Sequence, residues 1–116
     1  MKGLAPVLFA FACLGLAGSA FGADEATIQK GEKVFDYWCA TCHGPGLPGT
    51  VALETKYKGG KPALLSERTD LIPPVTKTFV RHGVSIMPFF RKTEITDADL
   101  DALAAYLARN NKTPNR

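Results

Sequence analysis

Two cysteines and a histidine lie within five consecutive residues of this chain, Cys39-Ala40-Thr41-Cys42-His43. Two thiols three positions apart can each add to one vinyl group of a haem, and the adjacent imidazole can then bind the iron. The motif therefore predicts covalent haem attachment at Cys39 and Cys42, with His43 as an axial ligand. A cofactor of this bulk replaces part of the side-chain core, so we expect short segments wrapped around it.

Three other interpretations of Cys39 and Cys42 stay open from these residues alone. A tryptophan before Cys-x-x-Cys is also found in thioredoxin-type redox sites, where the first thiol has a lowered pKa. Those sites follow a buried strand, whereas residues 29–33 are polar and fit a helix. A zinc site that adds His43 and His82 to the two thiols lacks the paired spacing of structural zinc sites. A plain disulfide is the third alternative, and haem attachment is favoured over all of them.

Residues 1–22 have the pattern of a secretory signal peptide. Lys2 supplies a positive charge, residues 4–16 are almost wholly apolar, and small residues precede the first acidic ones. The apolar run is shorter than the roughly 20 residues that a membrane-spanning helix needs. We expect cleavage after Gly22, with Ala20 and Ala23 as alternative sites, and export to the periplasm. This leaves 116 − 22 = 94 residues, a single domain at 23–116, and removes Cys13, so that Cys39 and Cys42 are the cysteines of the expected mature chain.

Charge and size narrow the function further. The formal net charge is +3 and falls to +2 without Lys2. A balance this mild, with no basic run interleaved with aromatic residues, argues against nucleic acid as a partner. The expected mature chain also has no stretch that would span a membrane. A domain this small has a marginal core and often depends on a disulfide, a metal or a cofactor.

The rest of the sequence predicts an all-α domain of short helices and long loops, because no segment alternates convincingly between apolar and polar residues. A first helix is expected from an N-cap at Asp24 or Thr27 up to the first cysteine of the motif. Residues 44–49, Gly-Pro-Gly-Leu-Pro-Gly, are expected to be loop, and residues 59–60 a turn. The apolar face of the first helix consists of Gly31, Val34, Phe35 and Trp38.

Three further helices are expected downstream. A short helix fits residues 63–67, and residues 73–74, both proline, can open the next one, because proline is tolerated in a first turn. Gly83 is placed to cap that helix, whose expected apolar side is Val75, Phe79 and Val80. The last helix begins at Thr96, which pairs with Asp99 as in a capping box. Its apolar stripe consists of Leu100, Leu103, Ala104 and Leu107.

Two residues of the expected mature chain can supply a second axial ligand to the iron, Met87 and His82. Met87 lies in the apolar run 86–90, far along the chain from His43, where a rigid loop can bring its thioether to the other haem face. An isolated methionine is usually a core residue, but the attachment motif favours ligation by Met87. His82 is expected at the surface or beside the haem propionates. Ligation by Met and His fills both axial positions, which suits electron transfer rather than oxygen chemistry.

The sequence resembles class I cytochromes c. This resemblance implies a small all-α fold around one covalent haem c, in which the first and last helices cross. It further implies that Gly31 and Phe35 lie at this crossing, against Leu103 and Tyr106. The residues that carry the resemblance are Gly31, Phe35, Cys39, Cys42 and His43.

A narrower resemblance, to the cytochrome subunits of the p-cresol methylhydroxylase family, covers most of the expected mature chain. It rests on residues 48–53, 56–59, 68–71 and 79–94. It implies a non-catalytic subunit, within a heterotetramer, of a periplasmic FAD flavoprotein that oxidises 4-alkylphenols such as p-cresol. Electrons would then pass to a soluble acceptor such as a blue-copper protein or another cytochrome. The alternatives are a freely diffusing monohaem cytochrome c of a respiratory chain and a thiol–disulfide redox protein.

Three further expectations concern the surroundings of the haem. The carbonyl of Pro48 is expected to accept the second N–H of His43, since ligating histidines usually donate that hydrogen. An apolar rim near the haem edge would consist of Leu47, Phe89 and Phe90. The cationic residues that could pair with haem propionates or with an acidic partner are Arg81, Arg91 and Lys92.

Overall fold

The computed structural model describes residues 22–113, so the expected signal peptide lies outside the described residues except for Gly22. Within this range the chain is helical, and its one strand-like feature is an isolated bridge between Val84 and Met87. The expected all-α fold is confirmed. None of the described helices is both long enough and apolar enough to cross a membrane. The elements are α1 (Glu25–Trp38), α2 (Ala40–His43), α3 (Pro48–Tyr57), the 3-10 helix η1 (Leu65–Glu67), α4 (Pro73–His82) and α5 (Asp97–Ala108).

Helix α1 begins where the sequence predicts it. Asp24 is the N-cap, and its carboxylate accepts a hydrogen bond of 2.7 Å from the backbone N–H of Thr27. This bond lowers the pKa of Asp24, whose negative charge also suits the positive end of the helix. The helix ends at Trp38, and α2 follows after Cys39.

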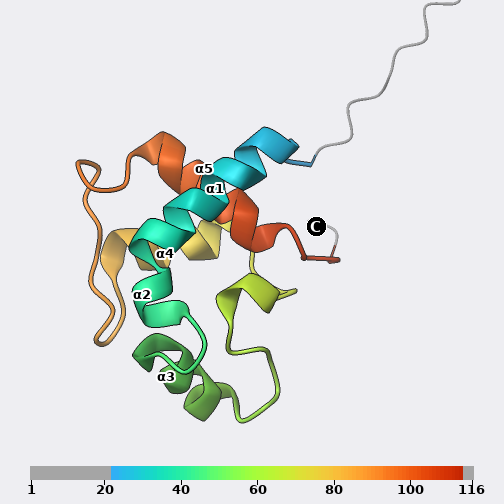
Figure 1. The fold of residues 1–116 in the computed structure, drawn as a ribbon, viewed down its shortest axis with the longest axis vertical. Coiled ribbons are helices and arrows are strands. Elements are labelled where there is room, and N and C mark those ends of the chain that lie inside the picture. Colours follow the sequence, from blue (N-terminus) through green and yellow to red (C-terminus); the bar gives the residue numbers. More distant parts are fainter. Residues whose placement is uncertain (1–21, 114–116) are drawn as a thin grey trace, which may run out of the picture.

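Helices α1 and α5 cross at a glycine (Figure 1). Gly31 and Phe35 are the buried residues of α1, and the ring of Phe35 lies 5.7 Å from that of Tyr106. A side chain on Gly31 would collide with the backbone of Ala102. The crossing that the family resemblance implies is therefore present, because only a residue without a side chain allows this approach.

Helix α5 supplies most of the core. Thr96 caps it: the hydroxyl accepts from the backbone N–H of Asp99 at 3.1 Å and donates to the Asp99 carboxylate at 2.8 Å. Ile95, just before the cap, is fully buried. The predicted apolar stripe of Leu100, Leu103, Ala104 and Leu107 is buried throughout, with exposures of 0–4%.

Helix α3 corrects the expectation that residues 44–49 form a loop. The loop ends at Leu47, and Pro48 and Gly49 form the first turn of α3. A proline lacks a backbone N–H, but the first residue of a helix does not need one, so Pro48 starts the helix instead of preventing it. Helix α3 ends at Tyr57 and is capped by Lys58 in the left-handed conformation, and the expected turn at residues 59–60 follows.

Helix α4 corrects a second expectation. Its two proline residues open it and Gly83 caps it, as predicted. The residues buried against α5, however, are Thr76 and Val80, whereas Val75 and Phe79 are 38% and 43% exposed. The helix thus has two apolar faces, one turned to α5 and the other to a shallow hollow that Val75 and Phe79 line together with Pro74 and Thr78.

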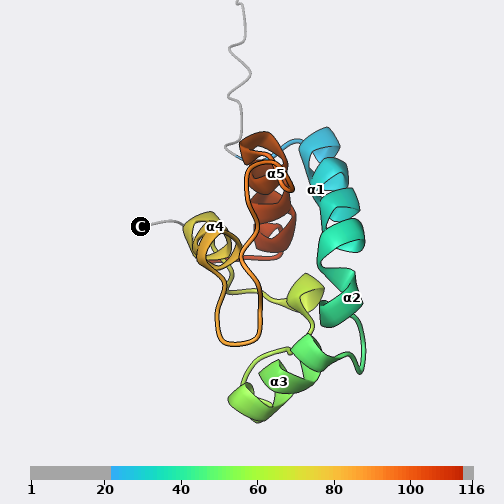
Figure 2. The ribbon, with the colours of Figure 1, turned by 90° about the vertical axis from the view of Figure 1, so that its left-hand side faces the viewer.

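Figure 2 shows how these elements are arranged. Helices α1 and α5 pack side by side, and α4 packs on α5. Below them, α2 continues down from α1, and the long loop between α4 and α5 descends on the other side. Helix α3 lies beneath both. The attachment motif and residues 83–90, here called the methionine loop, therefore descend on opposite sides of the lower half of the molecule.

Candidate functional site

Cys39 and Cys42 lie at the junction of α1 and α2, one helical turn apart. Both thiols are free, so the plain disulfide alternative is wrong in this structure. Cys39 is half-buried and packs against the core, whereas Cys42 is exposed. Burial, with a smaller contribution from Cys42, raises the pKa of the Cys39 thiol to about 12. The first thiol of the motif is therefore protonated at neutral pH.

His43 is the last residue of α2. Its backbone N–H donates to the carbonyl of Cys39 at 2.9 Å, which fixes the histidine one turn after the first cysteine. Burial lowers the pKa of the imidazole, which favours the neutral form that binds metals. Nδ1 is buried and has no hydrogen-bond partner among the described residues. The residue as a whole is half-buried.

The predicted hydrogen bond from His43 to the carbonyl of Pro48 is absent. The residue that lies against the imidazole is instead Gly49, which follows Pro48. A side-chain carbon on Gly49 would lie 3.0 Å from Nδ1 of His43 and 2.8 Å from the carbonyl of Cys42. The first turn of α3 therefore packs against the histidine ring. Packing, and not a hydrogen bond, sets the orientation of the ring.

Thr50 closes the loop that leads to Gly49. Its side chain is 1% exposed, and its hydroxyl donates to the carbonyl of Gly44 at 2.8 Å. The bond joins the start of α3 to the residue that follows His43. Sequence reasoning missed Thr50, because a single threonine next to a glycine-rich and proline-rich segment carries no periodic signal.

Met87 is held in a tight turn after α4. The backbone groups of Val84 and Met87 are hydrogen-bonded to each other in both directions, at 3.1 and 2.9 Å, around Ser85 and Ile86. Gly83 has a φ of +68°, and a side chain there would lie 2.6 Å from the carbonyl of Met87. Met87 itself is half-buried and contacts the core. The turn thus projects Ile86, which is 82% exposed, while keeping Met87 inside.

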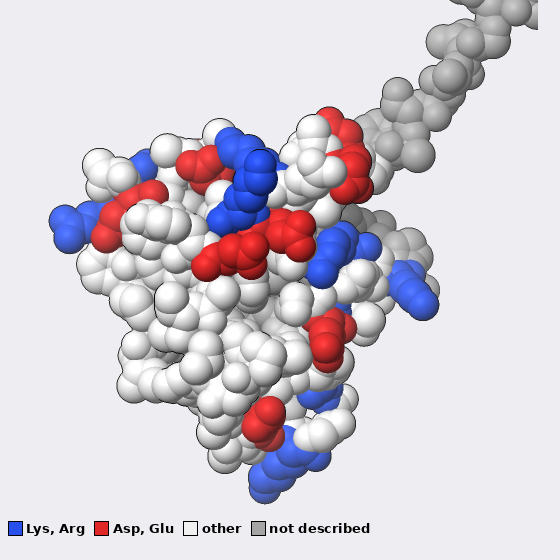
Figure 3. Space-filling model, in the orientation of Figure 1, with Lys and Arg blue, Asp and Glu red and all other residues white. Residues whose placement is uncertain are grey.

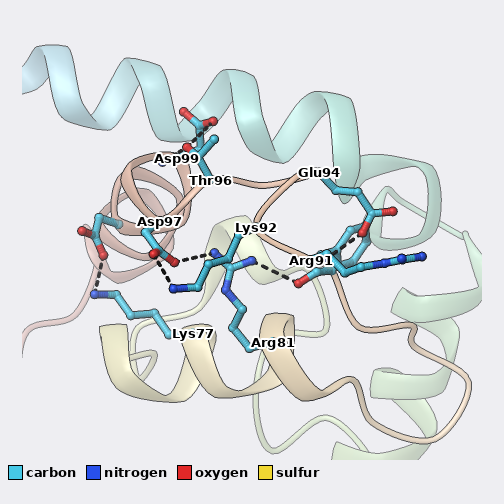
Figure 4. A network of polar contacts seen from close by, with 10 residues as sticks. Lys77, Arg81, Arg91, Lys92, Glu94, Thr96, Asp97 and Asp99 are labelled. Carbon is cyan, nitrogen blue, oxygen red and sulfur yellow. Dashed lines mark hydrogen bonds and ion pairs between the residues drawn. The ribbon is translucent and has the colours of Figure 1, made fainter.

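The basic residues near this loop pair within the chain (Figure 4). Arg81 donates to the carbonyl of Phe90 at 3.0 Å and to Asp97 at 2.9 Å, and Lys92 pairs with Asp97 at 2.8 Å. Their expected role as partners of propionates or of an acidic protein stays a prediction. Arg91 is exposed, and its backbone N–H donates to Glu94.

His82 is a surface residue, as expected. It is exposed, and its ring Nδ1 lies 2.9 Å from the carbonyl of Thr78 on the preceding turn of α4. In residues 22–113 no three histidine, cysteine, aspartate or glutamate side chains gather as metal ligands would. The structure thus does not bring His82 together with the cysteines in the arrangement that the zinc alternative requires.

Leu47 and Phe89 are exposed, by 37% and 58%, as expected for an apolar rim. Phe90 is not part of it: its ring turns inward and meets Trp38 edge-on at 5.8 Å. No charged residue occurs in residues 38–53 or 83–90. In Figure 3 charges gather over α1 and α5, whereas the surface over α2 is uncharged.

A buried arginine secures the far end of α3. Arg68 is 5% exposed and forms two hydrogen bonds with Asp70, of 2.6 and 2.9 Å, while its guanidinium lies 4.7 Å from the ring centre of Tyr57. Lys61 adds a third bond to Asp70 at 2.6 Å. Together, chiefly through Arg68, they hold the pKa of Asp70 well below its usual range. The cluster ties α3 to the segment before α4.

The donors described above suit a haem better than a metal ion alone. Cys39 and Cys42 are free thiols, His43 has a buried ring nitrogen without a hydrogen-bond partner, and Met87 adds a thioether on a separate loop. The described surface also carries exposed apolar side chains, which a large flat apolar group needs as contacts. These apolar side chains are Leu47, Val51, Ile72, Val75 and Phe79.

Known proteins share this pattern. The family model described as cytochrome C oxidase, cbb3-type, subunit III matches residues 26–107. Cytochrome c6 of Pyropia yezoensis is 32% identical over 100 residues, which cover 86% of this chain and 84% of that protein.

Two larger proteins are also similar. The cbb3-type cytochrome c oxidase subunits CcoP of Azospirillum brasilense and of Azospirillum sp. (strain B510) are 32% and 33% identical over 91 and 100 residues. These matches cover 72% and 81% of this chain but 28% and 31% of the CcoP subunits, so the chain spans less than a third of their length. No solved structure matches the chain.

Proposed function

The chain belongs to the cytochrome c family represented by subunit III of cbb3-type cytochrome c oxidase, and we propose that its haem is attached at Cys39 and Cys42, with His43 and Met87 as axial ligands. Members of this family bind haem c covalently, and one haem is usual for a domain of this size. The chain is accordingly an electron carrier. The observation that carries the ligand assignment is the opposition of α2 and the methionine loop across the lower half of the molecule.

The bound haem supplies a one-electron couple at its iron. The chain's residues decide how that couple behaves. His43 and Met87 would fill both axial positions, which leaves none for oxygen or peroxide. A methionine ligand also raises the reduction potential relative to ligation by stronger donors. We further propose that Val75 and Phe79, which line the hollow on α4, lie against the haem and exclude water from it. A low dielectric there further disfavours the more highly charged oxidised state.

The proposed electron donor is an FAD flavoprotein that oxidises 4-alkylphenols of the p-cresol type. Support comes from the resemblance of residues 48–53 and 79–94 to the cytochrome subunits of that enzyme family. The exposed Leu47, Ile86 and Phe89 belong to the uncharged segments 38–53 and 83–90, which suits a docked subunit. We propose periplasmic location after removal of residues 1–22, a heterotetramer with the flavoprotein, and onward transfer to a blue-copper protein or another cytochrome.

The second candidate is a freely diffusing cytochrome of a respiratory chain. It is favoured by the similarity to cytochrome c6, which extends over most of both chains. The thiol–disulfide alternative is disfavoured by Cys39, because its raised pKa is the opposite of the lowered value that a redox-active first cysteine requires.

Ligation and partnership are tested separately. For ligation, Met87→Ala is expected to abolish the weak far-red absorption band that marks sulfur bound to ferric haem. It should also lower the potential by on the order of 0.1 V, since axial ligands shift haem potentials over about 0.8 V in total. An unchanged band would exclude Met87. His82→Ala is the matched control, because His82 is the other residue that the sequence offers as a ligand, and it should leave the band intact.

For partnership, the tagged full-length protein is purified from its native host under mild conditions. Co-purification of a flavin-containing subunit, together with haem reduction on addition of p-cresol, is the expected result. Isolation as a monomer with no flavin fluorescence would favour the diffusing carrier. Both outcomes leave the ligation proposal untouched.

A further inference from the structure

We propose that Arg81 is a positioning residue for Met87, and that it acts through a hydrogen bond to the backbone of the loop that carries the thioether. The proposal rests on the proposed ligation by Met87. It assigns a function to the one basic side chain near the loop that is largely buried, with 18% of its surface exposed.

The methionine loop is tied to α4 at both ends. At its start, the N–H of Gly83 donates to the carbonyl of Phe79 at 2.8 Å. At its end, the N–H of Phe90 donates to the carbonyl of Val80 at 2.8 Å, and the carbonyl of Phe90 accepts from Arg81 at 3.0 Å. Both backbone polar groups of Phe90 are therefore held by consecutive residues of α4. The methionine loop therefore begins and ends against the last turn of α4.

Of these ties, the bond from Arg81 is the one made by a side chain, so it can be removed by mutation. Figure 4 shows how the guanidinium is itself fixed: one nitrogen points to the carbonyl of Phe90 and another to Asp97 in the first turn of α5. The planar fork of an arginine presents a separate nitrogen to each acceptor in a fixed geometry, whereas a lysine has one flexible nitrogen for both. Arg81 therefore links Phe90, at the end of the methionine loop, to α5.

A thioether is a neutral donor without the charge that strengthens other ligands, so its bond to iron depends strongly on being presented in place. Without the Arg81 bond, Phe90 keeps only its backbone bond to Val80, so the end of the loop is held less firmly. This raises the conformational entropy of the unbound loop and weakens the bond to iron without altering the sulfur. The Val84–Met87 bridge lies within the methionine loop, so it cannot replace the lost hydrogen bond from Arg81. The predicted effect is thus on how easily Met87 is displaced.

The test is displacement of Met87 from the ferric holoprotein by added imidazole, followed through the far-red band. Arg81→Leu is expected to bind imidazole about tenfold more tightly than the parent protein, which corresponds to about 1.4 kcal/mol. Arg81→Lys should lie between the two. Asp97→Asn keeps the bond to Phe90 and should change the affinity less than Arg81→Leu does.

Lys77→Ala is the matched control. Lys77 lies one turn earlier on α4 and pairs with Asp101 of α5, so its loss removes an ion pair between the same helices without touching the loop. Imidazole affinity should stay at the parental value. If Arg81→Leu and Arg81→Lys bind imidazole no more tightly than Lys77→Ala, the proposal is overturned. If Arg81→Leu yields no holoprotein, the comparison of Arg81→Lys with Lys77→Ala decides in the same way.

Failure of the ligation proposal is recognised independently. If Met87→Ala retains the far-red band, Met87 is not the ligand and both proposals fall. If Met87→Ala loses the band while imidazole affinity is unchanged in both Arg81 variants, ligation stands and the positioning role of Arg81 is refuted.

Discussion

Gly31 packs directly on the backbone of Ala102: a side-chain carbon on Gly31 would lie 2.0 Å from the Ala102 carbonyl oxygen and 2.7 Å from Cβ of Tyr106. The obstacle is mostly helix backbone, which cannot turn aside as a flexible side chain can. The distance between α1 and α5 is therefore set by this one residue.

Gly31→Ala should consequently destabilise the holoprotein, although alanine is normally better than glycine inside a helix by about 1 kcal/mol. We expect the free energy of unfolding to fall by about 2 kcal/mol or more, within the usual cost of overpacking a core. Denaturant unfolding measures it. Lys33→Ala, on the exposed side of the same helix, is the control and should change stability by no more than about 0.5 kcal/mol.

Thr50→Val should loosen the loop around His43. Valine has nearly the same shape but cannot donate to the carbonyl of Gly44, so one buried hydrogen bond is lost and we expect about 1 kcal/mol of destabilisation. Thr55→Val is a closely matched control, because Thr55 lies on the same helix and its hydroxyl donates to the carbonyl of Val51 at an exposed site. Equal losses in the two variants would show that burial of Thr50 is unimportant.

Asp70 should make the stability of the protein depend on acid pH. Its pKa is lowered in the folded state, chiefly by Arg68, so its contribution is present above the unfolded pKa of about 3.9. That contribution is lost as the pH falls below this value. Asp70→Asn should therefore be less stable than the parent at neutral pH by up to about 1 kcal/mol, since the carboxylate is partly exposed to solvent.

The stability gap between Asp70→Asn and the parent should narrow as the pH falls below about 4. Glu67→Gln removes the same charge from an exposed residue of the same segment and serves as the control. A gap that stays constant from neutral to acid pH would contradict the assigned cause of the pKa shift.

Replacing Cys39 and Cys42 together by serine should abolish haem that survives acid–acetone extraction. Because the haem replaces part of the core, the protein made without it should also lack a cooperative thermal transition by circular dichroism. A colourless double variant that still melts cooperatively would show that α1, α4 and α5 suffice as a core. Ser85→Ala, at an exposed turn position outside the motif, should leave the extractable haem content unchanged.

The sequence predicted those parts of the fold in which local signals and tertiary packing agree. Asp24 and Thr96 cap helices in the structure, because a short polar side chain before an apolar repeat can accept a hydrogen bond from a free backbone N–H of the first turn. Helix α3 was missed because glycine and proline at residues 44–49 were interpreted as loop, whereas Pro48 is acceptable in a first turn. The two apolar faces of α4 were merged into one, since periodicity gives the faces of a helix but not what covers each.

The candidate site shows the same division. Cys39, Cys42 and His43 are recognisable because their spacing is chemical and local. Three other features depend on distances between segments that are separate in the sequence. They are the packing of Gly49 on His43, the buried Thr50, and the hydrogen bond from Arg81 to Phe90. The positive charge of Arg81 suggested an external partner, and only the structure shows that its hydrogen bonds are made inside the chain.

The absence of charge from residues 38–53 and 83–90 has a consequence for kinetics. Long-range attraction between opposite charges speeds the encounter of two proteins and weakens steeply as salt is added. A surface without charges offers no such steering, so association through it should be slow but nearly indifferent to ionic strength. A subunit that stays docked on its donor loses nothing by this, because it has no need to find that donor again for each electron.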